Sequence, residues 1–247
     1  TGIFTGVYAG SNLSYSVTDE NNCGPVFGSI NVPEPPAISN VNAVVSSAVL
    51  CNGETATVTI SATGGTAPLS YTFNGVTNST GVFTGITPGS NIPWSVTDAN
   101  GCGPVTGTLN VTQPNALTAS VSESSSITCF GGTAEIRITA SGGTGIKTYS
   151  FDGQPDNTTG IFLGIIAGTY NWRVEDENGC FTEGTYEVQQ PTEVEISSIG
   201  SNSDICQGQT LTLNSAAQGG TGNLSYSWTS PNGFTSNSPN PSTGNAT

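Results

Sequence analysis

Six cysteines are the most reactive side chains of this 247-residue chain, and they occupy two recurrent kinds of position. Three begin C-x-G segments and three close D-x-N-x-C segments: Cys51, Cys129 and Cys206, then Cys23, Cys102 and Cys180. No two of them have the short spacing of a zinc knuckle, and the chain has no histidine to complete one. Regular cysteines in a chain poor in lysine and rich in threonine favour disulfides and an oxidising, extracellular setting over buried free thiols.

The aspartate that opens each D-x-N-x-C segment is the second recurrent group: Asp19, Asp98 and Asp176. One interpretation is an Asx-type turn, in which the carboxylate accepts backbone N–H groups. The other is a calcium site at a domain junction, joined by acidic residues such as Glu34 or Glu193. Because calcium needs about six to eight oxygen ligands and each junction offers few carboxylates, we favour the turn. We expect no other cofactor or metal.

No catalytic site is expected. Serine and threonine nucleophiles need a base, but the chain has no histidine and only three basic residues: Lys147, Arg137 and Arg173. Most carboxylates stand singly, and a cluster such as Glu175–Glu177 occurs once only, which argues against paired-carboxylate chemistry. Aromatic residues alternate with aliphatic ones, which is more typical of a core than of a sugar-stacking platform. They are Tyr71, Phe73, Trp94, Tyr149, Phe151, Trp172, Tyr226 and Trp228.

These residues recur because the whole chain repeats itself, with a period of 78 or 79 residues (Cys51 to Cys129; Thr1 to Thr80). A period this long predicts tandem domains rather than one large core. We expect complete repeats at 36–114 and 115–191, a C-terminal half-repeat at 1–35 and an N-terminal half-repeat at 192–247. Pro35, Pro114 and Pro191 mark the boundaries. Without an initiator methionine or a signal peptide, the chain is interpreted as an internal segment of a longer polypeptide.

Alternating apolar residues predict an all-β fold. In the first complete repeat Ala56, Val58 and Ile60 alternate with threonines, and Asp98–Gly101 forms a hairpin turn. About seven short strands per repeat describe an immunoglobulin-like β-sandwich, and no helical periodicity occurs. We therefore expect an elongated array of such sandwiches. Trp94 and Trp172 are predicted to be buried at equivalent positions on the strand before the turn.

The charge limits the partners. A net charge of −14 with three basic residues argues against nucleic acid and against anionic membrane surfaces. No apolar run is long enough to insert into a membrane.

The order C-N-G, G-G-T-x-P-x-x-Y, G-x-Y/W-x-V-T-D-x-N-G-C and Q-P resembles the SprB-type repeat of cell-surface adhesins from gliding Bacteroidetes, exported by type IX secretion. The resemblance covers 1–191, and from 192 the chain is more similar to bacterial Ig-like or PKD-like modules. Asn22 and Phe130 depart from the pattern, replacing a turn glycine and the asparagine of C-N-G. The resemblance implies an extracellular filament or adhesin attached to the cell surface.

Two disulfide patterns are open. The familiar one joins cysteines within a repeat, Cys51 to Cys102 and Cys129 to Cys180. However, Cys51 and Cys102 should lie at opposite ends of a sandwich, about 26 Å apart along a strand, whereas a disulfide needs Cα atoms within about 7 Å. In a head-to-tail array Cys51 would instead meet Cys180 across a junction. We slightly favour this inter-domain pair, which leaves Cys23, Cys102, Cys129 and Cys206 without partners in the segment.

The sequence therefore predicts the stalk of a large secreted surface adhesin, acting as spacer and multivalent contact surface in attachment or gliding. Its ligand would be a surface polysaccharide or another cell-surface molecule. One alternative is a self-assembling filament subunit, in which sheet edges pair between chains. Another is an array of carbohydrate-binding modules of a secreted enzyme, which would require an exposed aromatic patch.

Overall fold

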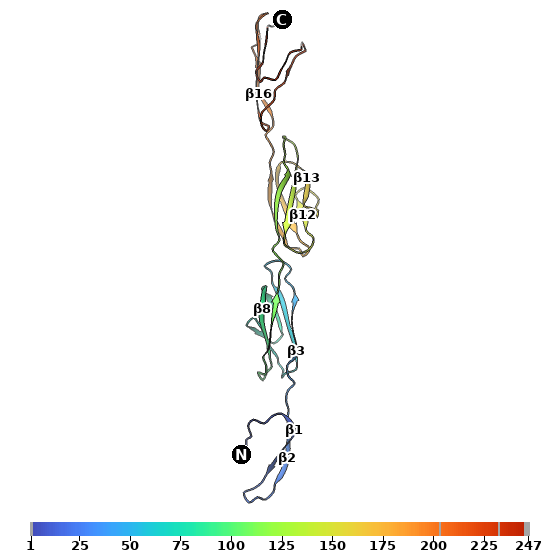
Figure 1. The fold of residues 1–247 in the computed structure, drawn as a ribbon, viewed down its shortest axis with the longest axis vertical. Coiled ribbons are helices and arrows are strands. Elements are labelled where there is room, and N and C mark those ends of the chain that lie inside the picture. The colour runs from blue at the N-terminus through green and yellow to red at the C-terminus, as the bar shows by residue number, and fades with distance from the viewer. Residues whose placement is uncertain (1, 203, 232, 245–247) are drawn as a thin grey trace. The chain divides into compact units, whose positions relative to one another are not determined.

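Strands make up all the regular structure of the chain in a computed structural model, which describes residues 2–202, 204–231 and 233–244 (Figure 1). The prediction of an all-β fold is confirmed. Within the described ranges no helix is long and apolar enough to span a membrane. The chain divides into two compact units, Thr1–Pro114 and Asn115–Thr247. The four-domain division and the elongated arrangement stay predictions.

The first complete repeat folds into two antiparallel sheets. One has the order β3-β4-β7 (Ser39–Ser47, Ala56–Thr63, Val82–Ile86), and the other has the order β6-β5-β8-β9 (Val76–Asn78, Ser70–Phe73, Gly89–Thr97, Val105–Val111). On β4 the apolar residues Ala56, Val58 and Ile60 are buried and alternate with less buried threonines, as predicted. They share one buried cluster with Phe73 and Val96 of the second sheet, so the two sheets pack as a sandwich.

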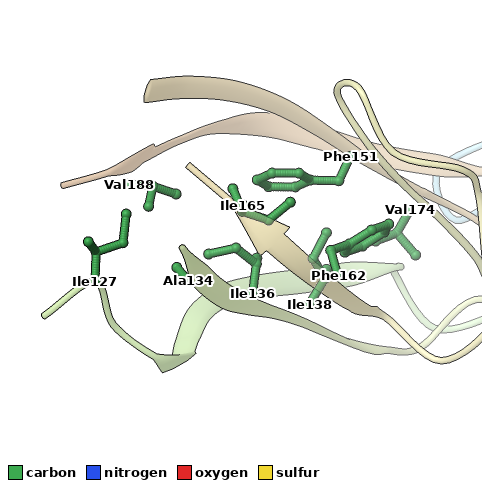
Figure 2. Close-up of a cluster of buried hydrophobic side chains, with 9 residues drawn as sticks. All are labelled: Ile127, Ala134, Ile136, Ile138, Phe151, Phe162, Ile165, Val174 and Val188. Atoms are coloured by element: carbon green, nitrogen blue, oxygen red, sulfur yellow. The ribbon is translucent and has the colours of Figure 1, made fainter. Parts of the chain in front are cut away.

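The second complete repeat has the same plan with one strand fewer. Its sheets are β10-β11-β13 (Thr118–Ser125, Ala134–Ser141, Ile161–Ile165) and β12-β14-β15 (Thr148–Phe151, Gly168–Glu175, Phe181–Val188). Figure 2 shows the buried side chains between them, with Ile136 and Phe162 from one sheet and Phe151 from the other. Each repeat therefore has its own hydrophobic core.

The flanking segments contain parts of the same pattern. Residues 1–35 form a hairpin of β1 (Gly10–Val17) and β2 (Val26–Val32), at the position of β8 and β9 in the repeat. Residues 192–247 contain the sheet β16-β17-β20 (Glu195–Ser201, Leu211–Gln218, Ser242–Thr243) and the pair β18-β19 (Trp228–Thr229, Thr235–Ser236).

The tryptophans are less buried than predicted. Trp94 and Trp172 do occupy equivalent positions and pack against the two cores, but both are only half-buried. Each lies opposite a glycine of the neighbouring edge strand, Gly107 or Gly184. A Cβ atom on either glycine would collide with the indole ring. The indoles thus lie over Gly107 and Gly184 of the edge strands β9 and β15.

Candidate functional sites at the two ends of each repeat

The aspartate of the D-x-N-G-C turn joins two loops that are distant in sequence. Asp98 follows β8 and is 6% exposed. Its carboxylate accepts the backbone N–H groups of Asn100 (3.0 Å) and Cys102 (2.8 Å) inside the turn. It also accepts the N–H of Thr66 at 2.9 Å, from the Gly-Gly-Thr loop between β4 and β5. One side chain therefore closes its own turn and fastens it to a second loop.

The second repeat has the same arrangement. Asp176 is 5% exposed and accepts the N–H groups of Asn178 (2.9 Å), Cys180 (3.0 Å) and Thr144 (2.7 Å). Backbone hydrogen bonds in the opposite direction complete the contact, from Ala99 to the Thr66 carbonyl and from Glu177 to the Thr144 carbonyl. We call this region the aspartate end of a repeat.

These hydrogen bonds determine the charge state of the two carboxyl groups. The amides of Thr66 and Cys102, with that of Asn100, lower the pKa of Asp98, although burial opposes them. Burial is the largest single influence on Asp176 and raises its pKa, but the amides of Thr144, Cys180 and Asn178 together outweigh it, so that the pKa is lowered. Amide donors stabilise the ionised form of a carboxyl group, so both are anions at neutral pH.

The same donors bear on the calcium hypothesis. Asp19, which is exposed, accepts the Cys23 amide at 2.7 Å, again as a turn anchor. Calcium at Asp98 or Asp176 would have to displace amide donors that already contact both carboxylate oxygens. Among the described residues no group of three or more histidine, cysteine, aspartate or glutamate side chains is placed to hold a metal ion.

The Gly-Gly-Thr loop fits this end because its first glycine has no side chain. Gly64 has a φ of +77° and Gly142 a φ of +76°. A Cβ atom on either would collide with a backbone carbonyl oxygen, that of Ala37 or Ala116. The next residue, Gly65 or Gly143, donates its N–H to the carbonyl of Pro36 (2.7 Å) or Asn115 (2.9 Å), in the segment before the first strand of the repeat. The G-G-T loop is thus hydrogen-bonded both to the Asp turn and to the first residues of its repeat.

The opposite end of each repeat is built around a glutamine. The Gly53 amide of the C-N-G turn donates to Oε1 of Gln113 at 2.9 Å, and Gly131 donates to Gln190 at the same distance. In the first repeat Asn52 Nδ2 also donates to the Pro114 carbonyl at 2.9 Å. We call this the glutamine end. It explains why C-x-G and Q-P recur together, about 60 residues apart in the chain.

The two cysteine positions lie at these different ends. In the β8–β9 hairpin Val96 pairs with Val105 beside the Asp turn, and Gly89 pairs with Val111 beside Gln113. Cys51 therefore lies at the glutamine end and Cys102 at the aspartate end, separated by the seven residues of β9, or about 23 Å.

The oxidation states agree with that separation. Cys51 and Cys180 are disulfide-bonded. Cys23, Cys102, Cys129 and Cys206 are exposed free thiols. The pairs Cys51–Cys102 and Cys129–Cys180, which are the familiar pattern, are therefore not formed.

Comparison with known proteins gives one family. Residues 43–78, from β3 to β6, match the SprB repeat. The predicted resemblance is confirmed over this segment, which includes the C-N-G and G-G-T motifs. No curated protein matches the chain. The family match indicates an extracellular, adhesin-like repeat region of a structural or adhesion kind.

The solved structures that resemble the chain have low sequence identity to it. The chain is 15% identical to the three N-terminal domains of the outer capsid protein Hoc of bacteriophage RB49, covering 76% of this chain and 71% of that one, with a TM-score of 0.39. It is 16% identical to a C-terminal fragment of intimin in complex with the intimin-binding domain of its receptor, covering 65% and 67%, with a TM-score of 0.41.

Proposed function

We propose that this chain is a stalk segment of a secreted bacterial surface adhesin, in which the repeats act as spacer and as a multivalent contact surface. The observation that carries the proposal is that the polar residues common to the two repeats form the same hydrogen bonds at the ends of each repeat. Asp98 and Asp176 are held by amides in the same way, and so are the Gly53 and Gly131 turns. Residues that form the same contacts in successive domains stabilise each domain of an array, and they are not specific to one ligand.

Separate cores suit a chain under load. Each complete repeat buries its own cluster of apolar side chains, so each can unfold and refold without its neighbour. Weak contacts repeated along such a chain act together, because each bound repeat raises the effective concentration of the next. The attachment role and the location at the cell surface are part of this proposal and follow the SprB match.

We further propose that Cys51 and Cys180 are bonded to each other. Both are oxidised, and their intra-repeat alternatives are free thiols. Such a bond would join the glutamine end of the first repeat to the aspartate end of the second and would restrict bending between them. By translation of the repeat, Cys102 and Cys129 would form the same bond with neighbouring repeats of the same kind.

Single-molecule stretching of the whole chain tests both parts. With the bond intact, the residues between Cys51 and Cys180 should not extend. Reduction should release about 45 nm of additional contour length, at about 3.6 Å per residue. The variant carrying Cys51→Ser and Cys180→Ser should behave as the reduced chain without any reductant, and Cys102→Ser should behave as the wild type.

Two results would count against the proposal. Equal contour lengths before and after reduction, with a Cys51–Cys102 peptide in a non-reducing digest, would exclude the inter-repeat bond. Extension of the reduced chain at negligible force, without separate unfolding events, would exclude a role as a load-bearing spacer.

A further inference from the structure

Each complete repeat has a groove at the same place on its second sheet. In the second repeat it measures about 550 Å³ and is lined from β12, β14 and β15 by residues that include Ser150, Asn171 and Thr185. In the first repeat it measures about 370 Å³ and includes the corresponding residues Thr72, Pro93 and Thr108. These positions alternate along their strands with residues that pack on the cores, so the grooves lie on the face turned away from the sandwich.

A short sequence difference makes the second groove larger. In the first repeat Asn74 and Gly75, both with positive φ, form a tight turn, and Val76–Asn78 then pairs with β5 as β6. The second repeat has Asp152-Gly153-Gln154-Pro155-Asp156 in place of Asn74-Gly75-Val76-Thr77, one residue more. Proline has no N–H to donate to a sheet. Only a single bridge, Tyr149 to Asn157, remains there. The 152–156 loop thus forms a wall that the first repeat lacks.

The two grooves also differ in chemistry. The first is lined mainly by threonine, serine, proline and glycine, without a charged side chain. The second adds Asp152, Gln154, Asp156, Arg173 and Glu183. It therefore offers carboxylates, amides, hydroxyls and a guanidinium within one hollow.

Two of these side chains already have partners within the repeat. The guanidinium of Arg173 contacts Glu175 at 2.7 Å and Glu183 at 3.8 Å, and its central carbon lies 3.7 Å from the ring centroid of Phe181. Asp152 accepts two hydrogen bonds from Asn171, from the backbone N–H at 2.9 Å and from Nδ2 at 2.8 Å.

We infer that this groove of the second repeat binds a neutral, hydroxyl-rich saccharide through hydrogen bonds, without the aromatic stacking expected of a carbohydrate-binding module. Sugar hydroxyls both donate and accept, which matches carboxylate acceptors beside amide and hydroxyl groups. Three carboxylates against one guanidinium disfavour anionic ligands, as does the net charge of −14. A volume of about 550 Å³ lies within the range of small-ligand sites. The first repeat, with its narrower and uncharged groove, does not share the site.

This inference rests on the proposed role of the chain as a contact surface, and it names the ligand class of one repeat. It is tested by titrating the ¹⁵N-labelled chain with cellohexaose, mannohexaose and xylohexaose, followed by amide chemical shifts. With at least one of them, the amides of Gly153, Asn171 and Thr185 should move at millimolar concentrations, and those of Gly75 and Thr108 should not. Hexagalacturonate and hexalysine serve as acidic and basic comparisons.

Two variants separate binding from folding. Asp156→Ala changes an exposed loop residue and should weaken binding about tenfold or more, since a hydrogen bond to a charged group is lost. Replacing residues 154–156 by the Val-Thr pair of the first repeat should abolish binding while preserving the spectrum elsewhere, because the first repeat folds with that loop. The matched change Thr106→Ala, in the other groove, should have no effect.

The inference is overturned if no neutral saccharide shifts the amide resonances of the groove at about 10 mM, a concentration above a millimolar dissociation constant. It is also overturned if only hexalysine does so, or if both repeats respond alike. Failure of this inference would leave the spacer role intact, because the spacer role is tested by the stretching experiment and not by ligand binding in the groove.

Discussion

Phe151 offers a sharp test of whether each repeat is stabilised by its own core. The side chain is 2% exposed. Its ring centroid lies 5.4 Å from that of Phe162 and 4.9 Å from that of Tyr170. Truncating a buried phenylalanine to alanine costs about 3–5 kcal/mol, and two aromatic contacts are lost with it. A domain of this size has about 5–15 kcal/mol of stability in total. Phe151→Ala should therefore remove a large share of the stability of the second repeat.

The loss should be confined to that repeat. A repeat of about 80 residues loses about 4–8 °C of melting temperature per kcal/mol, so its transition should fall by about 12–40 °C. Hydrogen exchange followed by mass spectrometry gives the location. Amides of β11 and β13 in the Phe151→Ala variant should exchange faster, and those of β4 should not change.

Two comparisons make the result decisive. Leu163→Ala removes an exposed side chain on β13, 62% exposed, and should change stability by less than about 0.5 kcal/mol. Phe73→Ala should reproduce the large loss in the first repeat, with β4 now exchanging faster. A Phe151→Ala variant that loses less than about 1 kcal/mol, or that destabilises both repeats equally, would refute the view that the cores are separate.

Three further outcomes are expected. First, the contribution of Asp98 and Asp176 to stability should be constant above about pH 5. It should fall at lower pH, because both have folded-state pKa values below their ordinary value of 3.8 and the contribution is lost as the pH falls through the lower folded value. Melting curves between about pH 6 and pH 2 should show this acid limb, and Asp176→Asn should flatten it. Second, Gly142→Ala should destabilise more than Gly131→Ala in urea unfolding, because both have positive φ but only Gly142 has a carbonyl oxygen in the way; the conformation alone costs about 1–2 kcal/mol. Third, Trp172→Ala should lower the free energy of unfolding less than Phe151→Ala does, because the indole is half-buried. Equal losses in the same urea assay would show that Trp172 contributes as much as a core residue.

Much of the fold could be predicted because its signals are local. Period-two alternation at Ala56, Val58 and Ile60 identifies a strand and its inner face without any knowledge of its neighbours. The positions of Cys51 and Cys102 at opposite ends followed from strand direction alone. The repeat supplied each expectation more than once, so that one irregular copy did not obscure the pattern.

What could not be predicted depends on contacts between distant residues. Alternation placed Trp94 and Trp172 on the inner face, but it does not tell how far the opposite sheet covers the strand, and both indoles are only half-buried beside Gly107 and Gly184. The Asp turn was expected, whereas its bond to the Thr66 amide, 32 residues away, has no local signal. It could have been suspected only from the joint recurrence of G-G-T with D-x-N-G-C.

The comparison of two repeats in one chain separates construction from recognition. At the ends, where Asp98 and Asp176 meet their amides, both repeats use the same residue types at nearly the same distances. On the outer face of the second sheet the strands β5, β8 and β9 correspond to β12, β14 and β15, yet one copy carries neutral residues and the other has an extra loop residue and charged side chains. A requirement imposed by joining domains acts on every copy alike, whereas a requirement imposed by a ligand acts only on the copy that binds it. Of the two complete repeats, the second therefore carries the groove in which specificity for a partner is to be sought.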